Sequence, residues 1–163
     1  MLGAGIALPT DLEPDTALNG FVSIGASRTT ISPTGVNKYE TAAYEIAEQA
    51  LAPERRGALV PCTPTGVVDA TCADMFVRTL GRRLFRRALT DAEAGRYVAV
   101  AGEAASTLGD FHVGLEFALA GLLQSPYFLF RVEIGAPVGD PEHPRYSNHH
   151  MAPRLSSVLR NTT

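Results

Sequence analysis

The stretch that decides the fold is CADMFVRTLGRRLFRRALTDAEAGRYVAVAGEAASTLGDFHVGLEFALAGLLQSPYFLFRVE, which runs from Cys72 to Glu133. It holds most of the periodic apolar residues of the chain. In its first part they recur every three or four positions, the spacing that gathers side chains on one face of a helix. Asp69 precedes this part as a candidate N-cap, so we expect a helix over residues 70–87. Its buried face would carry Ala73, Phe76, Val77, Leu80 and Leu84.

A second helix start follows at Thr90-Asp91-Ala92-Glu93. This order is a capping box, in which the Thr hydroxyl accepts from the Glu backbone N–H and the Glu carboxylate accepts from the Thr backbone N–H. The helix that it opens is expected over residues 91–105. Because its buried positions are mostly small, a neighbouring helix can approach closely. These positions are Ala94, Tyr97, Val98, Ala101 and Ala105.

A third helix is expected over residues 111–124, after the break at Gly109-Asp110. It has the most apolar stripe of the chain, so we expect it to form the core with the two helices before it. Ser125-Pro126 can end this helix or start a short new one over 126–133; we favour the restart, although the aromatic and β-branched residues there also fit a strand. The predicted core comprises Leu115, Leu119, Leu122, Phe76, Leu80 and Tyr97.

Upstream, Ser32-Pro33 is typical of a helix start, and Pro53 of a stop, so a helix is expected over residues 33–51. Its predicted buried face carries Val36, Tyr39, Ala43, Ile46 and Ala50. Residues 1–32 show little helical period. The fold class is therefore all-α, a compact bundle of four or five helices with an irregular N-terminal loop region. We divide the chain into an N-terminal loop plus helix module (1–61), a central helical module packed on it (62–134), and a linker with the start of a further module (135–163).

The bulk composition excludes several classes of protein. Of 163 residues, 45% are hydrophobic and 19% charged, which is an ordinary globular balance rather than a disordered one. The net charge of −3 gives no general attraction to nucleic acid. No apolar run reaches the roughly 18 residues that a membrane span requires. Met1 to Pro9 lacks the basic start and cleavage site of a signal peptide, so we expect a removed signal or a start inside a larger protein.

The sequence assigns no catalytic residue and no metal site. It contains no nucleophile elbow, phosphate loop or dinucleotide fingerprint. The histidines His112, His143, His149 and His150 are not spaced as metal ligands, and their pattern favours a surface interpretation. Asp110 and Glu116 are the carboxylates nearest to the central aromatic residues, and an acid/base pair there is an alternative that the sequence does not favour. Whether the chain is an enzyme is left open.

Two further features leave alternatives open. Cys62 and Cys72, the only cysteines, are either two free thiols or one disulfide. Arg78, Arg82 and Arg86 would share one face of the helix over 70–87, and such a face can bind a polyanion. More often it is a solvated face whose charges pair with neighbouring acids such as Asp91, Glu93 or Glu133, and we favour that interpretation because the acidic net charge adds no attractive field.

The runs GRRLFRRALTDAEAGRY and GLEFALAGLLQSPYFLFRVE resemble the helical module of large secreted proteins of planctomycetes and myxobacteria, built from planctomycete-specific domains of unknown function. We call these runs the arginine string and the Ser-Pro string. The first hallmark comprises Gly81, Arg82, Arg83, Phe85, Arg86, Arg87, Leu89, Thr90 and Glu93, and the second Leu123 to Pro126, Phe128, Leu129 and Arg131 to Glu133. Residues 7–43 resemble the preceding module of these proteins and 151–163 the opening of the next.

The resemblance implies a location outside the cytoplasm, secreted, periplasmic or on the cell surface. In such a compartment a Cys62–Cys72 disulfide is favoured over free thiols. Later modules of the family often carry a Cys-x-x-Cys-His haem site; that motif does not occur in this sequence, so no cofactor is expected in this chain. The first hypothesis is a structural or interaction module whose partners are the downstream modules or other surface proteins. The second is the non-haem portion of an extracellular redox or polysaccharide-acting enzyme, and the third a polyanion or nucleic-acid binder.

The last stretch predicts a continuation of the chain. Residues 135–150 have the Pro, Gly and polar composition of an interdomain linker. In the thirteen residues after it, Met151, Leu155, Val158 and Leu159 have helical spacing. A helix this short is marginal unless it packs on a surface, so we expect this segment either to fray or to borrow one.

Overall fold

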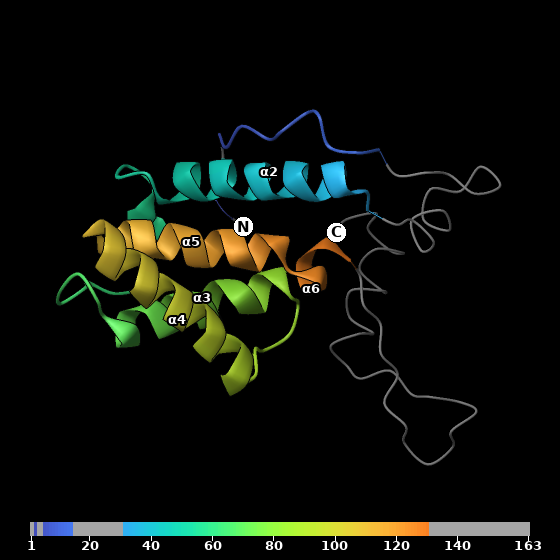
Figure 1. Cartoon of the computed structure of the whole chain (residues 1–163). Helices are drawn as coiled ribbons and strands as arrows, with labels where there is room; N and C mark the ends of the chain where they lie inside the picture. Colours follow the sequence, from blue (N-terminus) through green and yellow to red (C-terminus); the bar gives the residue numbers. More distant parts are fainter. Residues whose placement is uncertain (1, 3–4, 15–30, 131–163) are drawn as a thin grey trace, which may run out of the picture.

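A computed structural model describes residue 2, residues 5–14 and residues 31–130 (Figure 1). Within these residues all regular structure is helical, which confirms the all-α prediction. The elements are α2 (Pro33–Leu51), a 3-10 turn η1 (Arg56–Ala58), α3 (Ala70–Leu84), α4 (Asp91–Leu108), α5 (Phe111–Gln124) and the short α6 (Pro126–Leu129).

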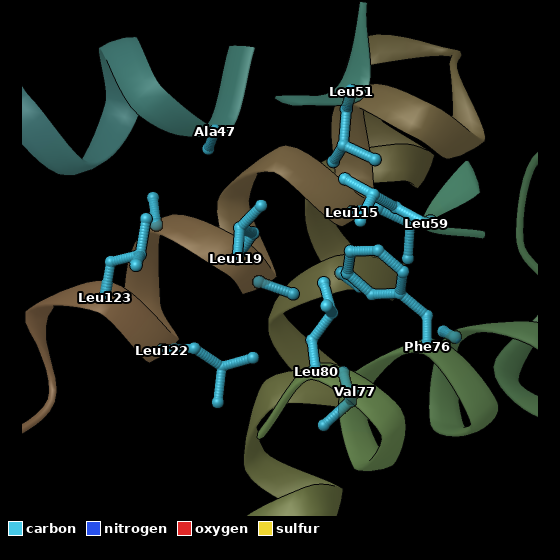
Figure 2. Packing of buried hydrophobic residues seen from close by; sticks show 14 of the residues in the cluster. Ala47, Leu51, Leu59, Phe76, Val77, Leu80, Leu115, Leu119, Leu122 and Leu123 are labelled. Carbon is cyan, nitrogen blue, oxygen red and sulfur yellow. The ribbon is translucent and has the colours of Figure 1, made fainter. Parts of the chain in front are cut away.

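Helix α5 lies at the centre of the bundle. It contacts α2, α3, α4 and α6, and Figure 1 shows α2 running along one side of it with α3 and α4 on the other. In Figure 2, leucines of α5 meet Leu51 of α2 and Phe76 and Leu80 of α3. Five of the six predicted core residues are fully buried, and the sixth, Tyr97, is partly buried against them. One core therefore joins α2 to the helices of the central stretch.

The helices begin where local side chains cap them. The hydroxyl oxygen of Ser32 accepts from the backbone N–H of Gly35 (3.0 Å), and Asp69 accepts from that of Cys72 (2.9 Å). The capping box at Thr90 is present with both of its bonds. Each cap satisfies backbone N–H groups that have no partner inside the helix, which is why the sequence located these starts correctly.

The helix ends differ more from prediction. Helix α3 ends at Leu84 rather than at residue 87: Phe85 is its C-cap, and Arg86 adopts a left-handed backbone with a φ of 57°. Helix α4 runs on to Leu108, three residues past the expected end, and stops at Gly109 with a φ of 75°. The restart at Pro126 is confirmed as the short α6. This helix ends at Leu129, with Phe130 as an extended C-cap, so the predicted end at residue 133 is wrong; residues 131–133 lie outside the described residues.

Two close approaches between segments depend on glycine. A Cβ atom on Gly81 of α3 would lie 2.5 Å from Cδ1 of Leu89, which folds back from the α3–α4 connection. A Cβ atom on Gly114 of α5 would press on the backbone carbonyl oxygen of Ala101 and on Ala105, both in α4. The small-residue seam predicted for α4 is thus present, and α5 approaches it through Gly114.

Candidate functional site

The arginine string and the Ser-Pro string meet in space around Arg87. Its guanidinium carbon lies 4.5 Å from the ring centroid of Tyr127 and 5.7 Å from that of Phe85, distances at which a cation is attracted to an aromatic face. The two rings are themselves 5.5 Å apart, measured between centroids. We call this cluster, completed by Thr90 and Glu93, the arginine junction. It connects the end of α3, the start of α4 and α6.

Within the arginine junction, Arg87 and Glu93 form a two-pronged ion pair. Nη1 and Nη2 of Arg87 donate to the two carboxylate oxygens of Glu93 at 2.8 and 2.6 Å. The same carboxylate accepts from the backbone N–H of Thr90 (2.8 Å) and from its hydroxyl (3.0 Å). The hydrogen bonds from Arg87 above all, with those from Thr90, lower the pKa of Glu93 from its ordinary 4.5 to about 2. Glu93 is therefore ionised at neutral pH and acts as an anchor.

The three arginines of the predicted anion-binding face are not held on one helix. Arg78 in α3 donates to Asp74 (2.8 Å) and to Asp91 (2.9 Å), and these hydrogen bonds raise the pKa of the arginine. Arg82 is exposed on α3, whereas Arg86 lies beyond the end of that helix. The prediction of a continuous helical face is wrong at Arg86, because α3 stops one turn early. Whether the remaining arginines bind an anion stays a prediction.

The cysteines are joined: Cys62 and Cys72 form a disulfide, with their Cα atoms 5.7 Å apart. The bond fixes the loop before α3 to the first turn of that helix. Asp69 strengthens the same loop, because it accepts from the backbone N–H of Thr65 (3.0 Å) as well as from that of Cys72, and these bonds lower the pKa of the carboxyl. The arrangement explains how a loop rich in Pro and Gly is held in place.

Asp110 and Glu116 are in different environments. Asp110 is the N-cap of α5, and the backbone N–H groups of Val113 and His112 that it binds lower the pKa of its carboxyl. Burial, with smaller contributions from Glu48 and Asp110, raises the pKa of Glu116. Burial and then Arg56 lower the pKa of His112. Because its carboxylate is engaged in capping, Asp110 is not a convincing member of an acid/base pair.

The candidate metal-ligating side chains do not cluster in the described residues. Among residues 5–14 and 31–130 no group of three His, Cys, Asp or Glu side chains is arranged to hold a metal ion. His143, His149 and His150 lie outside the described residues.

An apolar groove of about 490 Å³ lies between residues 5–14, α2, the ends of α3 and α5, and α6. We call residues 5–14 the strap and this hollow the strap groove. Of the predicted buried face of α2, Ala43 and Ala50 are buried, whereas Tyr39 and Ile46 line the groove and Val36 is exposed. The lining comprises Leu2, Gly5, Ile6, Leu8, Pro9, Leu12, Tyr39, Ala42, Ala43, Ile46, Leu84, Leu123, Phe128 and Leu129.

Polar contacts fasten the strap to α2 and to Arg55, which follows that helix. Ala7 exchanges two hydrogen bonds with the side-chain amide of Gln49, at 2.8 and 3.3 Å. Lys38 donates to the backbone carbonyl of Asp11 (2.6 Å), and Arg55 to that of Gly5 (3.0 Å). The strap is thus held largely by its backbone, with Asp11 and Glu13 adding side-chain contacts to Lys38 and Ser32, and the groove stays open beneath its apolar side chains. The sequence offered only a weak sign of this, the apolar residues Ile6, Leu8 and Leu12 in a region that we expected to be an irregular loop.

The central stretch matches a known protein family. Residues 72–133 match the model of a family described as PSD5, protein of unknown function (DUF1595). This segment is less than half of the chain, and it contains both strings and the whole arginine junction. No curated protein and no solved structure matches the chain. In the part of the chain that the structure describes, no helix is long and apolar enough to cross a membrane.

Proposed function

We propose that this chain is a structural or interaction module of a secreted or cell-surface protein, and that its partners are other modules of that protein or neighbouring surface proteins. One observation carries the proposal. The two arginines that hold ion pairs here use them inside the module: Arg87 of the arginine string binds Glu93 and lies over Tyr127, and Arg78, just before the string, binds Asp74 and Asp91. Arg87, the most enclosed arginine of the string, therefore serves the architecture of the module.

The disulfide supports a location outside the cytoplasm, because reducing agents in the cytosol keep most thiols free. The match of residues 72–133 to a family of unknown function is consistent with a module that has no activity assigned. The resemblance to planctomycete and myxobacterial multi-module proteins points to large secreted assemblies as its setting. The alternative, the non-haem part of an extracellular redox or polysaccharide-acting enzyme, would place the reacting groups in other modules.

An architectural role for the string is tested by comparing Arg87→Ala with Arg82→Ala. Removal of Arg87 leaves the largely buried Glu93 without its main partner, and hydrogen bonds to charged groups contribute about 1.5–3 kcal/mol each in favourable cases. We expect Arg87→Ala to lower the free energy of unfolding by about 2 kcal/mol, measured by urea denaturation. Arg82→Ala is the matched control and should change it by less than about 0.5 kcal/mol, since Arg82 is exposed. Equal stabilities of the two variants would contradict the proposal.

Location is tested on intact cells that make the full-length protein. Cells are treated with a membrane-impermeant phosphine and then with an impermeant maleimide, and labelling of Cys62 and Cys72 is quantified by mass spectrometry. A surface module should be labelled as fully in intact as in lysed cells. Labelling only after lysis, or two thiols that react without the phosphine, would refute the extracellular location.

A further inference from the structure

We propose that the strap groove is a receptor for residues 151–160 of this same chain, which dock in it as an amphipathic helix. The groove is an apolar hollow at the surface of the described residues. Its lining is apolar along its whole length, and its volume of about 490 Å³ is within the 300–1,000 Å³ range of ligand-binding clefts. An open apolar hollow of this size is stabilised when apolar side chains fill it.

The geometry of the groove suits a short helix. On α2 the lining runs from Tyr39 to Ile46, seven steps along a helix or about 10 Å. The segment from Met151 to Leu159 spans eight steps, about 12 Å as a helix. Its apolar residues Met151, Leu155, Val158 and Leu159 fall at i, i+4, i+7 and i+8, the anchor spacing of helices that bind in grooves. The stripe and the groove therefore match in length and in chemistry.

Residues 131–150 are long enough to link the end of α6 to a tail bound in the groove. The last described residue, Phe130, directly follows Phe128 and Leu129, which line the groove. The twenty residues 131–150 can span up to about 65 Å when extended, so the connection back to the groove imposes little restriction.

The charge of the tail is opposite to that of the strap and α2. Residues 151–163 contain Arg154 and Arg160 and no acidic residue. Two of the elements that wall the groove, the strap and α2, hold five carboxylates and one lysine. The strap and α2 together carry a net negative charge, which attracts a basic segment at long range. The carboxylates are Asp11, Glu13, Glu40, Glu45 and Glu48.

Another segment of the chain, residues 15–30, competes for the same place and is the weaker candidate. Glu13 accepts hydrogen bonds from the hydroxyl and from the backbone N–H of Ser32, so the chain that leaves at Glu13 must return to the same point. Proximity does not separate the two candidates, because Leu12, next to Glu13, lines the groove. The difference lies in the sequence, since residues 1–32 lack the helical period that the tail has.

The test uses the full chain of 163 residues with the photoreactive p-benzoyl-L-phenylalanine in place of Tyr39 or, as a matched control, of Tyr44. Both tyrosines belong to α2, but Tyr39 lines the groove, whereas Tyr44 is exposed and its ring contacts that of Phe117 instead. After irradiation of the monomer, cross-linked peptides are mapped by mass spectrometry. We expect intramolecular cross-links from position 39 to residues 151–160, at least fivefold more than from position 44.

A second pair of variants separates docking from chance proximity. Leu155→Asp puts a charge on the apolar stripe and should reduce the cross-link from position 39 at least fivefold. Ser157→Asp puts the same charge on the opposite side of the helix and should leave it within twofold. Neither position belongs to the described bundle, and circular dichroism of each variant confirms that the bundle is folded. The proposal is overturned by cross-links from position 39 to residues 15–30 or to a second copy, by none at all, or by a yield that Leu155→Asp leaves unchanged.

Discussion

The close approach of α4 and α5 at Gly114 can be tested by adding one methyl group. In Gly114→Ala the new Cβ atom would lie 2.7 Å from Cβ of Ala105 and would also press on the carbonyl oxygen of Ala101. The first neighbour is a rigid methyl and the second is backbone, so neither can turn away as a long side chain would. The two helices would have to separate locally.

Two opposing effects decide the magnitude. Alanine is better than glycine inside a helix by about 1 kcal/mol. Overpacking a well-filled core costs about 1–3 kcal/mol and occasionally more. Because the obstacle at Gly114 is backbone, we place the cost at the upper end of this range, and we expect a net loss of about 2 kcal/mol in the free energy of unfolding.

The matched control is Gly95→Ala in α4. Gly95 is also inside a helix, but it is exposed, and a Cβ atom there would have no neighbour within 4 Å. Only the helix preference remains, so this variant should gain up to about 1 kcal/mol. Both variants are compared with the parent by urea denaturation, followed by circular dichroism, with the disulfide intact. If Gly114→Ala is as stable as the parent while Gly95→Ala is stabilised, the packing of α4 against α5 is not as described.

Three further outcomes are expected. Because the folded-state pKa of Glu93 is about 2, below its ordinary 4.5, its contribution is complete above pH 4.5 and is lost as the pH falls from about 4.5 to 2. The stability advantage of the parent over Glu93→Gln should shrink across that window, and an advantage independent of pH would contradict the assigned ion pair. Reduction of the Cys62–Cys72 disulfide should cost about 3 kcal/mol, and free-thiol titration of the denatured, unreduced protein should find none; two thiols would overturn the pairing. The exposed arginines should form no salt-sensitive complex with nucleic acid; a micromolar complex at physiological salt that is lost in Arg82→Ala would prove this expectation wrong.

The helix starts could be predicted from the sequence because their causes are local. A cap needs only one side chain and the two or three residues after it, as at Asp69 and Thr90. The end of α3 has no comparable local sign, since no glycine or proline stands there. The chain turns because Phe85 packs against the rings of Tyr97 and Tyr127, which lie in other helices. Such a stop depends on tertiary contacts that the sequence does not display.

The features of the candidate sites also divide into those that local sequence predicts and those that depend on tertiary packing. The ion pairs of the arginines with Asp91 and Glu93 were expected from charge and proximity along the chain, and they are present. The position of Tyr127 beneath Arg87 was not expected, because about forty residues separate them and only the packing of α6 brings them together. The strap groove was missed for a related reason. A helical period shows that Tyr39 and Ile46 face one way, but not whether that face is covered.

The arginine junction and the strap groove differ in how much free energy a bound group could gain. In the arginine junction each strong donor has an acceptor inside the module, so a ligand there would have to replace bonds that already exist, such as those between Arg87 and Glu93. In the strap groove the polar contacts are used to hold the strap, and the apolar side chains facing the hollow have no such bonds to lose. Filling it removes apolar surface from water, which stabilises a complex by about 25 cal/mol per Å². An apolar segment such as residues 151–160 therefore gains more at α2 and the strap than at the arginines. The residues with the clearest sequence pattern hold the module together, whereas the groove, of which the sequence shows little sign, is the better place for an apolar segment to bind.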